Sequence, residues 1–283
     1  MLRKNSTKGV CPLLCIFCYI CRKDFITPLL MKRIKFDLLR YKASLGNADA
    51  LFELYEIYGN GDEELGIPED YEKAKECLQK SADKGYAPAV GDLGYMYIQL
   101  SDNPEKGLEM EIEAADNGYV PSMYRVGEYF FTGKTFVMNR NPENLKVDVP
   151  RAIEYWEKAA RQDDVKSCLA YAKAIIMGVG LKEKYPIALD YLNFVCDEIV
   201  NNSDAENLPT FGEALFWKGY LYYYGLGVPA DEDMANIWFK QSKAIKFNSA
   251  IDVIDDGVDP RQALMNWSNP YDYDTWYKLY CEE

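Results

Sequence analysis

The sequence predicts an all-α solenoid of about five αα-hairpin repeats that stack side by side and end in helical caps. Three observations predict this fold class. A unit of two helices and a turn at residues 212–246 recurs upstream in the same register. Small residues recur at i, i+4 and i+8 along its first helices, which favours close packing of neighbouring helices. Hydrophobic residues make up 48% of the chain, so the stacked hairpins can bury a continuous core.

The last complete unit defines the register. Ala214 and Gly219 lie on the packing face of its first helix, and Gly225 stops that helix. Asp231 is expected to cap the second helix, because its side chain can accept a hydrogen bond from a free backbone N–H. Trp238 is expected to point from the second helix toward the first. The unit is therefore an αα-hairpin.

The same register recurs along the chain. A half-repeat that ends at Gly46 starts the stack, and each complete hairpin then opens with a small residue. These opening residues are Ala50, Ala89, Ser122, Ser167 and Ala214. The intervals between them are unequal, and the excess collects in loop-like segments at 61–69, 134–147 and 198–209. Solenoids tolerate such insertions because the stacked face stays untouched.

Three units depart from the pattern. The second has Leu100 where its first helix should end in glycine, and in the third Asp163 stands for the glycine that follows the second helix. The closing helix of the fourth keeps little of the pattern. We expect altered local packing at these places and the same fold.

Residues 1–30 differ from the rest and form a separate N-terminal segment. Basic residues flank the apolar run Cys11–Ile20, which is too short to span a bilayer. One interpretation is a segment translated in error or disordered, with Met31 as the true start. A second is an export or anchor signal, although no small-residue cleavage site follows. A third is a metal site, but four cysteines within eleven residues leave little chain to wrap a tetrahedral ion.

The C-terminal end is rich in aromatic residues. Ala250 begins a further helix that ends before Gly257, and we expect the tail to cover the last apolar face of the stack. The predicted organisation is the N-terminal segment at 1–30, the repeat solenoid at 31–256 and an aromatic capping segment at 257–283.

Charge and composition exclude several function classes. The chain has 45 acidic and 32 basic residues, and its net charge of −13 disfavours nucleic acid and anionic membranes as partners. It contains no histidine, which removes Ser-His-Asp, Cys-His and HExxH sites. We therefore expect no enzyme activity, no catalytic residues and no cofactor.

Two segments look like ligand-binding motifs but have structural interpretations. Gly127 and Gly133 look like part of a phosphate-binding loop, yet five residues separate them instead of four, and the segment follows a helix. Acidic residues around Gly257 look like a calcium loop, yet Ile254 occupies a ligand position. We interpret both as helix ends and expect no metal site.

The recurring pattern A-x3-L-G-x2-Y-x2-G, followed by D-x2-K-A-x2-W-x2-K-A-A-x2-G, resembles Sel-one-like repeats, a branch of the tetratricopeptide-type α-solenoids. The resemblance covers about residues 36–256. It implies a right-handed superhelix that serves as a non-enzymatic protein–protein interaction scaffold or adaptor. Two alternatives stay open: an immunity-type protein that neutralises a toxin by occlusion, and a secreted cysteine-rich repeat protein with hydrolase or cell-wall-binding activity.

In solenoids of this kind the first helices line the concave surface, so their side chains outside the packing positions form a candidate groove. Carboxylates beside aromatic rings suit a basic peptide or protein. The candidate protein-binding residues are Glu53, Glu56, Asp92, Tyr95, Arg125, Glu128, Tyr129, Lys173, Trp217 and Tyr220. A solvated or packing role is the open alternative for each of them. We expect no membrane partner unless the N-terminal segment anchors the chain, and the oligomeric state stays open.

Two cysteines bear on the compartment. Cys168 and Cys196 lie at the start of one predicted helix and the end of its antiparallel partner. The cysteine-rich subgroup of this family closes each hairpin by a disulfide, but the other hairpins here lack the second cysteine. Buried free thiols in a reducing cytoplasm are therefore the main interpretation. Export or membrane anchoring through residues 1–23 is the alternative.

Overall fold

The computed structural model describes residues 28–100, 103–135, 142, 145–177, 184–202 and 205–267 of the 283-residue chain. These residues form α-helices, one short 3-10 turn (η2, Ala205–Asn207) and one isolated bridge between Asp62 and Ile67. The predicted all-α class is confirmed. The predicted N-terminal signal or metal site and most of the aromatic tail lie outside the described residues.

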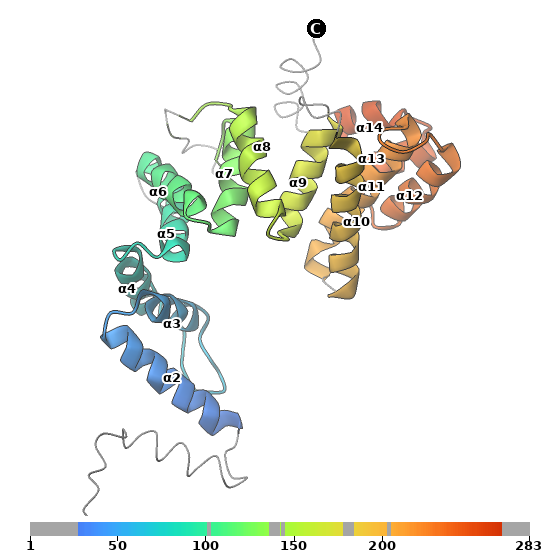
Figure 1. Cartoon of the computed structure of the whole chain (residues 1–283). Helices are drawn as coiled ribbons and strands as arrows, with labels where there is room; N and C mark the ends of the chain where they lie inside the picture. Colours follow the sequence, from blue (N-terminus) through green and yellow to red (C-terminus); the bar gives the residue numbers. More distant parts are fainter. Residues whose placement is uncertain are drawn as a thin grey trace, which may run out of the picture. The chain divides into compact units, whose positions relative to one another are not determined.

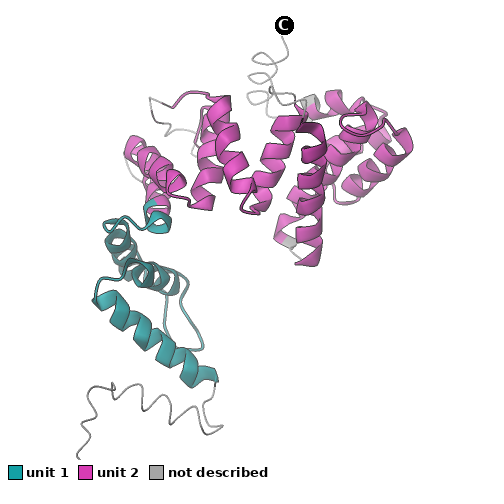
Figure 2. Ribbon diagram, in the orientation of Figure 1, with its two compact units in different colours: residues 1–90 teal, residues 91–283 magenta. Residues whose placement is uncertain are grey.

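The chain divides into two compact units, residues 1–90 and residues 91–283 (Figure 2). The first unit contains α2 (Pro28–Ser44), α3 (Ala48–Asn60) and α4 (Tyr71–Ala82). Helix α3 packs on both α2 and α4. Helix α5 (Ala87–Leu100) begins in the first unit and continues into the second. The domain limits expected at residues 30 and 256 stay predictions.

The second unit is a stack of hairpins in chain order (Figure 1). Each helix from α6 onward contacts its predecessor or its successor or both, which confirms the predicted solenoid of αα-hairpins. Helices α13 and α14 follow the last hairpin, where terminal helices were expected. The helices after α5 are α6 (Pro104–Asp116), α7 (Val120–Thr132), α8 (Val149–Ala160), α9 (Val165–Ile176), α10 (Tyr185–Asn201), α11 (Leu208–Tyr224), α12 (Glu232–Ala244), α13 (Asn248–Asp255) and α14 (Pro260–Trp267).

The opening residues of the repeats are at the centre of the packing. All five are buried; the first four are the third residue of α3, α5, α7 and α9, whereas Ala214 lies further along α11, which begins at Leu208. Their small side chains let the neighbouring helices approach closely. The predicted register is therefore confirmed.

Four of the five second helices, α4, α6, α8 and α12, begin with the same kind of cap, whereas Lys184 before α10 makes no such hydrogen bond. Asp231 accepts a hydrogen bond from the backbone N–H of Met234 at 2.9 Å, as predicted. Asp70 and Asp148 cap α4 and α8 in the same way. These side chains satisfy backbone donors that a helix start leaves unpaired.

Glycine on the first helix makes room for a bulky side chain on the second. A methyl group at Gly127 would lie 2.3 Å from Nε1 of Trp156, and one at Gly219 would lie 2.6 Å from the ring of Phe239. Trp238 lies against the first helix, as expected, and its neighbour Phe239 fills the space at Gly219. Phe239 is buried there, whereas the ring of Trp238 lies under Nζ of Lys218 at 3.6 Å.

Two residues adopt the backbone conformation that glycine has after the other second helices. Asp163 and Lys246 have φ angles of 62° and 65°, and Gly85 and Gly118 have 75° and 93° at the corresponding turns. Asp163 therefore stands for the missing glycine, as predicted. Aspartate adopts this left-handed backbone region more readily than lysine does. Lys246 therefore carries backbone strain.

Candidate interaction surface

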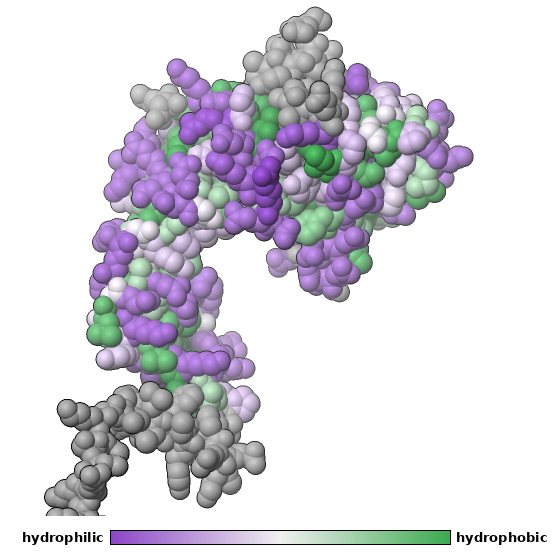
Figure 3. Space-filling view, viewed as in Figure 1, coloured by the Kyte–Doolittle hydropathy of each residue, from purple (hydrophilic) through white to green (hydrophobic). Residues whose placement is uncertain are grey.

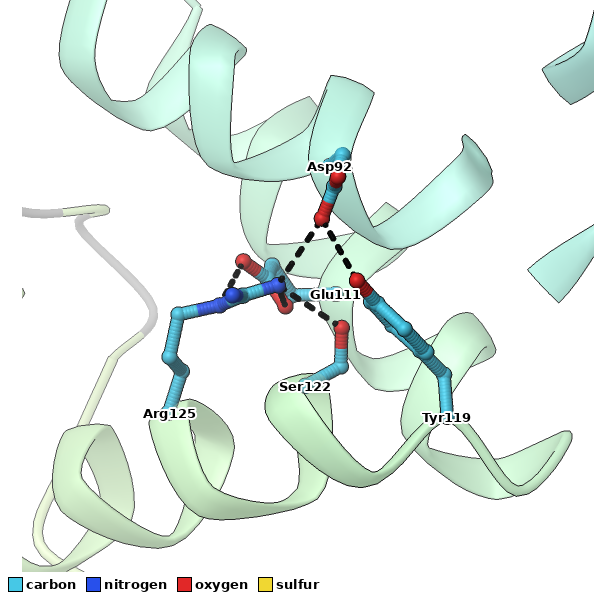
Figure 4. A network of polar contacts seen from close by, with 5 residues as sticks. All are labelled: Asp92, Glu111, Tyr119, Ser122 and Arg125. Carbon is cyan, nitrogen blue, oxygen red and sulfur yellow. Dashed lines mark hydrogen bonds and ion pairs between the residues drawn. The ribbon is translucent and has the colours of Figure 1, made fainter. Parts of the chain in front are cut away.

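A charged residue occupies a core position of α6. Glu111 is buried where the second helices of other repeats hold Leu78, Trp156, Leu192 and Phe239. Its partner is Arg125 on α7, whose Nε and Nη2 donate to the two carboxylate oxygens at 2.7 and 3.1 Å (Figure 4). A bidentate arrangement of this kind is the strongest form of protein ion pair. It joins α6 to α7 with fixed geometry.

Three further side chains extend this ion pair into a polar network. Asp92 on α5 accepts a hydrogen bond from Tyr119 at 2.9 Å and lies 3.8 Å from Nη2 of Arg125. The same Nη2 donates to Oγ of Ser122 at 3.1 Å. Figure 4 shows Arg125 at the centre, between the two carboxylates. We call these five residues, Asp92, Glu111, Tyr119, Ser122 and Arg125, the polar network.

Burial sets the protonation of the network. It raises the pKa of Glu111, and Arg125 opposes this rise by stabilising the carboxylate. Burial likewise raises the pKa of Asp92, against the effects of Tyr119 and Arg125. Burial next to these acids raises the pKa of Tyr119 as well. The hydroxyl of Tyr119 thus stays a hydrogen-bond donor to Asp92.

The network continues into a row along the first helices of the second unit. The guanidinium of Arg125 lies 4.9 Å from the ring centre of Tyr95. Burial raises the pKa of Tyr124, and the charges of Glu128 and Glu213 add to this rise. Glu213 on α11 then pairs with Lys173 on α9 at 2.6 Å. The row of Tyr95, Arg125, Glu128, Lys173 and Glu213 is called the first-helix face below.

Aromatic residues of α11 lie beside the first-helix face, at the end of the row that holds Glu213. Nε1 of Trp217 lies 3.4 Å from Glu213, and the Trp217 and Tyr220 rings are 5.2 Å apart. Arg261 on α14 donates to the Tyr220 hydroxyl at 3.4 Å and lies over the ring of Tyr224. Arg261 and Tyr224 thus tie α14 to the end of α11.

The structure brings only part of the predicted groove together. Asp92, Tyr95 and Arg125 meet, and Glu213 links Lys173 to Trp217. Three predicted aromatic residues, Tyr129, Trp217 and Tyr220, are buried in this structure. Glu53 and Glu56 are exposed on α3, in the first unit.

Sequence reasoning missed several residues of this surface. Glu111, Tyr119, Tyr124 and Glu213 were absent from the predicted set. A signal existed for Glu111, because a glutamate stands at a second-helix position that is otherwise filled by large apolar side chains. Its partner could then have been sought among cations on the following first helix.

Within the described ranges no group of three or more Cys, Asp or Glu side chains could hold a metal ion. Cys168 and Cys196 are buried free thiols, as expected. No helix in the described part of the chain has the length and apolar character needed to cross a bilayer.

The recurring features of the hairpins match a known repeat family. Residues 48–86, 120–164 and 212–244 match the model of the Sel1 repeat. The chain contains Sel1 repeats. The three matches cover the α3/α4, α7/α8 and α11/α12 hairpins, whereas the two unmatched hairpins include the departures at Leu100 and in the fourth closing helix.

The Sel1-repeat chain is also similar to individual bacterial proteins. The Sel1-repeat-containing protein YjcO of Escherichia coli K12 is 30% identical over 105 residues, which are 37% of this chain and only 42% of that relative. A Sel1 repeat protein of Oxalobacter formigenes is 21% identical, with a TM-score of 0.55 over 88% of this chain and 97% of that one. The latter likeness concerns the fold alone. Immunity protein PA5088 of Pseudomonas aeruginosa is 16% identical, with a TM-score of 0.44 over 82% of this chain and 81% of that one, which is too low for an inference.

Proposed function

We propose that the first-helix face of the second unit binds a segment of another protein, and that the chain acts as a non-enzymatic scaffold. Sel1 repeats generally mediate protein–protein interaction, and stacked hairpins offer a long surface for it. The observation that carries the proposal is the row of half-buried acidic, basic and aromatic side chains on successive first helices. Such side chains combine contact area with hydrogen bonding and charge.

The charge of the face favours a basic ligand. Together with the polar network it holds four carboxylates and two cations, a net charge of −2; the acids are Asp92, Glu111, Glu128 and Glu213. Arg125 and Lys173 are already paired with acids. Glu128 supplies a carboxylate and Tyr95 an aromatic ring, and both kinds of group suit a lysine or arginine of the ligand.

The test is capture of partners by the immobilised full chain, followed by mass spectrometry. We expect one dominant partner whose binding weakens as salt is raised. The variant Tyr95→Ala/Glu128→Lys should lose it while circular dichroism stays helical. Tyr71→Ala/Glu109→Lys makes the same chemical changes at exposed positions of second helices and should retain it. A partner that both variants bind equally would contradict the proposal.

We also infer that the chain has no enzymatic activity and works in a reducing compartment. The absence of histidine from the whole sequence and the lack of a nucleophile beside a general base on the first-helix face support the first inference. The buried free thiols of Cys168 and Cys196 support the second. Hydrolysis of a generic ester that survives Tyr95→Ala/Glu128→Lys would overturn the scaffold assignment.

A further inference from the structure

Helix α2 carries apolar side chains on two opposite faces. One face holds Leu39 and Ala43, which are buried against α3. The other face includes Leu38 and Tyr41, which are 52% and 62% exposed, and it is followed just past the helix end by Leu45, which is 70% exposed. Hydrophobic side chains among hydrophilic ones are visible on the surface of this unit in Figure 3. Among the described residues of the first unit, Leu38 and Tyr41 on this second face stay exposed.

The spacing of the exposed face is that of a coiled-coil seam. Its members alternate at intervals of three and four residues, as positions a and d of a heptad do: half-buried Met31 and Ile34, exposed Leu38 and Tyr41, and Leu45 one residue past the helix end. On a helix of about 3.6 residues per turn they fall within an arc of about 80°. A helix that lies in a membrane surface has a broad apolar face, whereas a narrow a/d stripe accepts another helix. The seam therefore favours a helical partner.

Helix α2, which carries the seam, is strongly basic, although the whole protein is acidic. Helix α2 has five cations and one anion, a charge of +4, in a chain with a net charge of −13. Lys32 pairs with Asp62 and Glu64. Lys35 and Lys42 take position e beside the seam, are exposed, and have no ion-pair partner within the described residues. Position e is where coiled coils select partners by charge.

We propose that the Met31–Leu45 seam docks an acidic amphipathic α-helix of another protein. This partner carries apolar residues at its own a and d positions and Glu or Asp opposite Lys35 and Lys42. Charge disfavours two other occupants of the seam: the N-terminal residues of this chain and α2 of a second copy. Residues 1–27 hold five basic residues and one acidic residue, a charge of +4, and α2 of a second copy is also +4. Both would be repelled.

The position of the seam fits docking in trans. Because Leu39 and Ala43 face α3, a helix can lie on the opposite side of α2 without displacing the core. Within α2 the seam runs from Met31 to Tyr41, about one and a half heptads, so it buries an area at the small end for specific interfaces. We expect a reversible complex that raised salt weakens, since part of its affinity comes from exposed charges.

The test uses two synthetic four-heptad peptides and the full chain. Both peptides have Ile at a and Leu at d, and they differ only in carrying Glu or Lys at e and g. In fluorescence anisotropy at low salt the Glu peptide should bind at least about tenfold more tightly than the Lys peptide. Leu38→Glu should abolish binding. Lys35→Glu/Lys42→Glu should reverse the preference between the peptides.

Control variants separate binding at the seam from a general effect of lost apolar surface. Tyr71→Glu changes an apolar residue that is 69% exposed on α4 and should bind the Glu peptide normally. Circular dichroism should stay helical in all variants, because the altered side chains are exposed. The proposal fails if charge reversal leaves the preference unchanged. It also fails if Leu38→Glu abolishes only binding to phosphatidylglycerol vesicles, or only a dimer seen by sedimentation equilibrium.

Discussion

Arg125 and Glu111 meet in a two-point ion pair inside the helical stack. The Glu111 side chain has no exposed area, and Nε of Arg125 lies 2.7 Å from its Oε1. An apolar residue fills this position in the neighbouring repeats. The pair therefore holds α6 and α7 together through charge where the other repeats use hydrophobic contact.

Arg125→Met should destabilise the protein by about 3–5 kcal/mol, because it leaves a buried carboxylate without its cation. Adding Glu111→Leu should recover most of the loss, since the double variant restores the apolar residue that the other repeats have. Urea unfolding followed by circular dichroism measures both changes. Equal midpoints for the single and double variants would show that the unpaired carboxylate is not the cause of the loss.

Gly127→Ala should destabilise the α7/α8 hairpin by about 1–3 kcal/mol, because the added methyl group would lie 2.3 Å from Trp156. Gly59→Ala on α3 is the matched control. No atom lies within 4 Å of the corresponding methyl group, so alanine should stabilise that helix by about 0.5–1 kcal/mol. Thermal unfolding should show shifts of opposite sign, and a loss in both variants would contradict the packing argument.

Lys246→Gly should raise stability by about 0.5–1 kcal/mol, because glycine adopts the φ of 65° after α12 without strain. Lys240→Gly removes the same side chain from an exposed position inside α12 and should lower stability by about 1 kcal/mol. Denaturant midpoints measure both. If Lys246→Gly is as destabilising as its control, the turn carries no strain.

Stability should fall between pH 9 and pH 11, in part through Cys196. Burial raises the pKa of this thiol from an ordinary value of 9.0 to about 11. In that range the unfolded chain loses the thiol proton and the folded chain keeps it, so rising pH favours unfolding. At pH 11 the accumulated loss from this group should be about 2 kcal/mol.

The comparison with Cys196→Ala isolates this effect, because lysine and tyrosine titrations are common to both proteins. The variant starts from a lower stability, since alanine leaves a small cavity. Its stability should nevertheless decline less than that of the parent chain from pH 9 to pH 11. Parallel curves from urea titrations at each pH would show that Cys196 does not contribute.

The fold could be predicted from sequence because its signals are local. Small residues that open each first helix, aspartates that cap second helices and Asp163 in place of a glycine each depend on a few neighbouring residues. Trp238 contacts the first helix as predicted, but the deeper burial of Phe239 was missed, because either of two adjacent aromatic residues fits the period of a helix. Only the facing Gly219 decides that Phe239 is the one buried.

The candidate site was harder to predict because it depends on contacts between repeats. The positions of Asp92 and Tyr95 along α5 and of Arg125 along α7 indicated that all three share a face. The structure places them together. The same rule could not show that Trp217 is buried, since α11 contacts α9, α10 and α12. Glu111 was missed because its partner belongs to the next hairpin.

The backbone hydrogen bonds that close the hairpins have a practical consequence. The N–H of Asp148 donates to the carbonyl of Phe130 at 2.7 Å, and that of Asp231 donates to Tyr222 at 2.9 Å, although the first connection is much longer than the second. The same closure thus holds two connecting segments of different length. The connection between α7 and α8 is therefore a suitable position for grafting an epitope or a fluorescent label, since the added sequence would leave the closure in place.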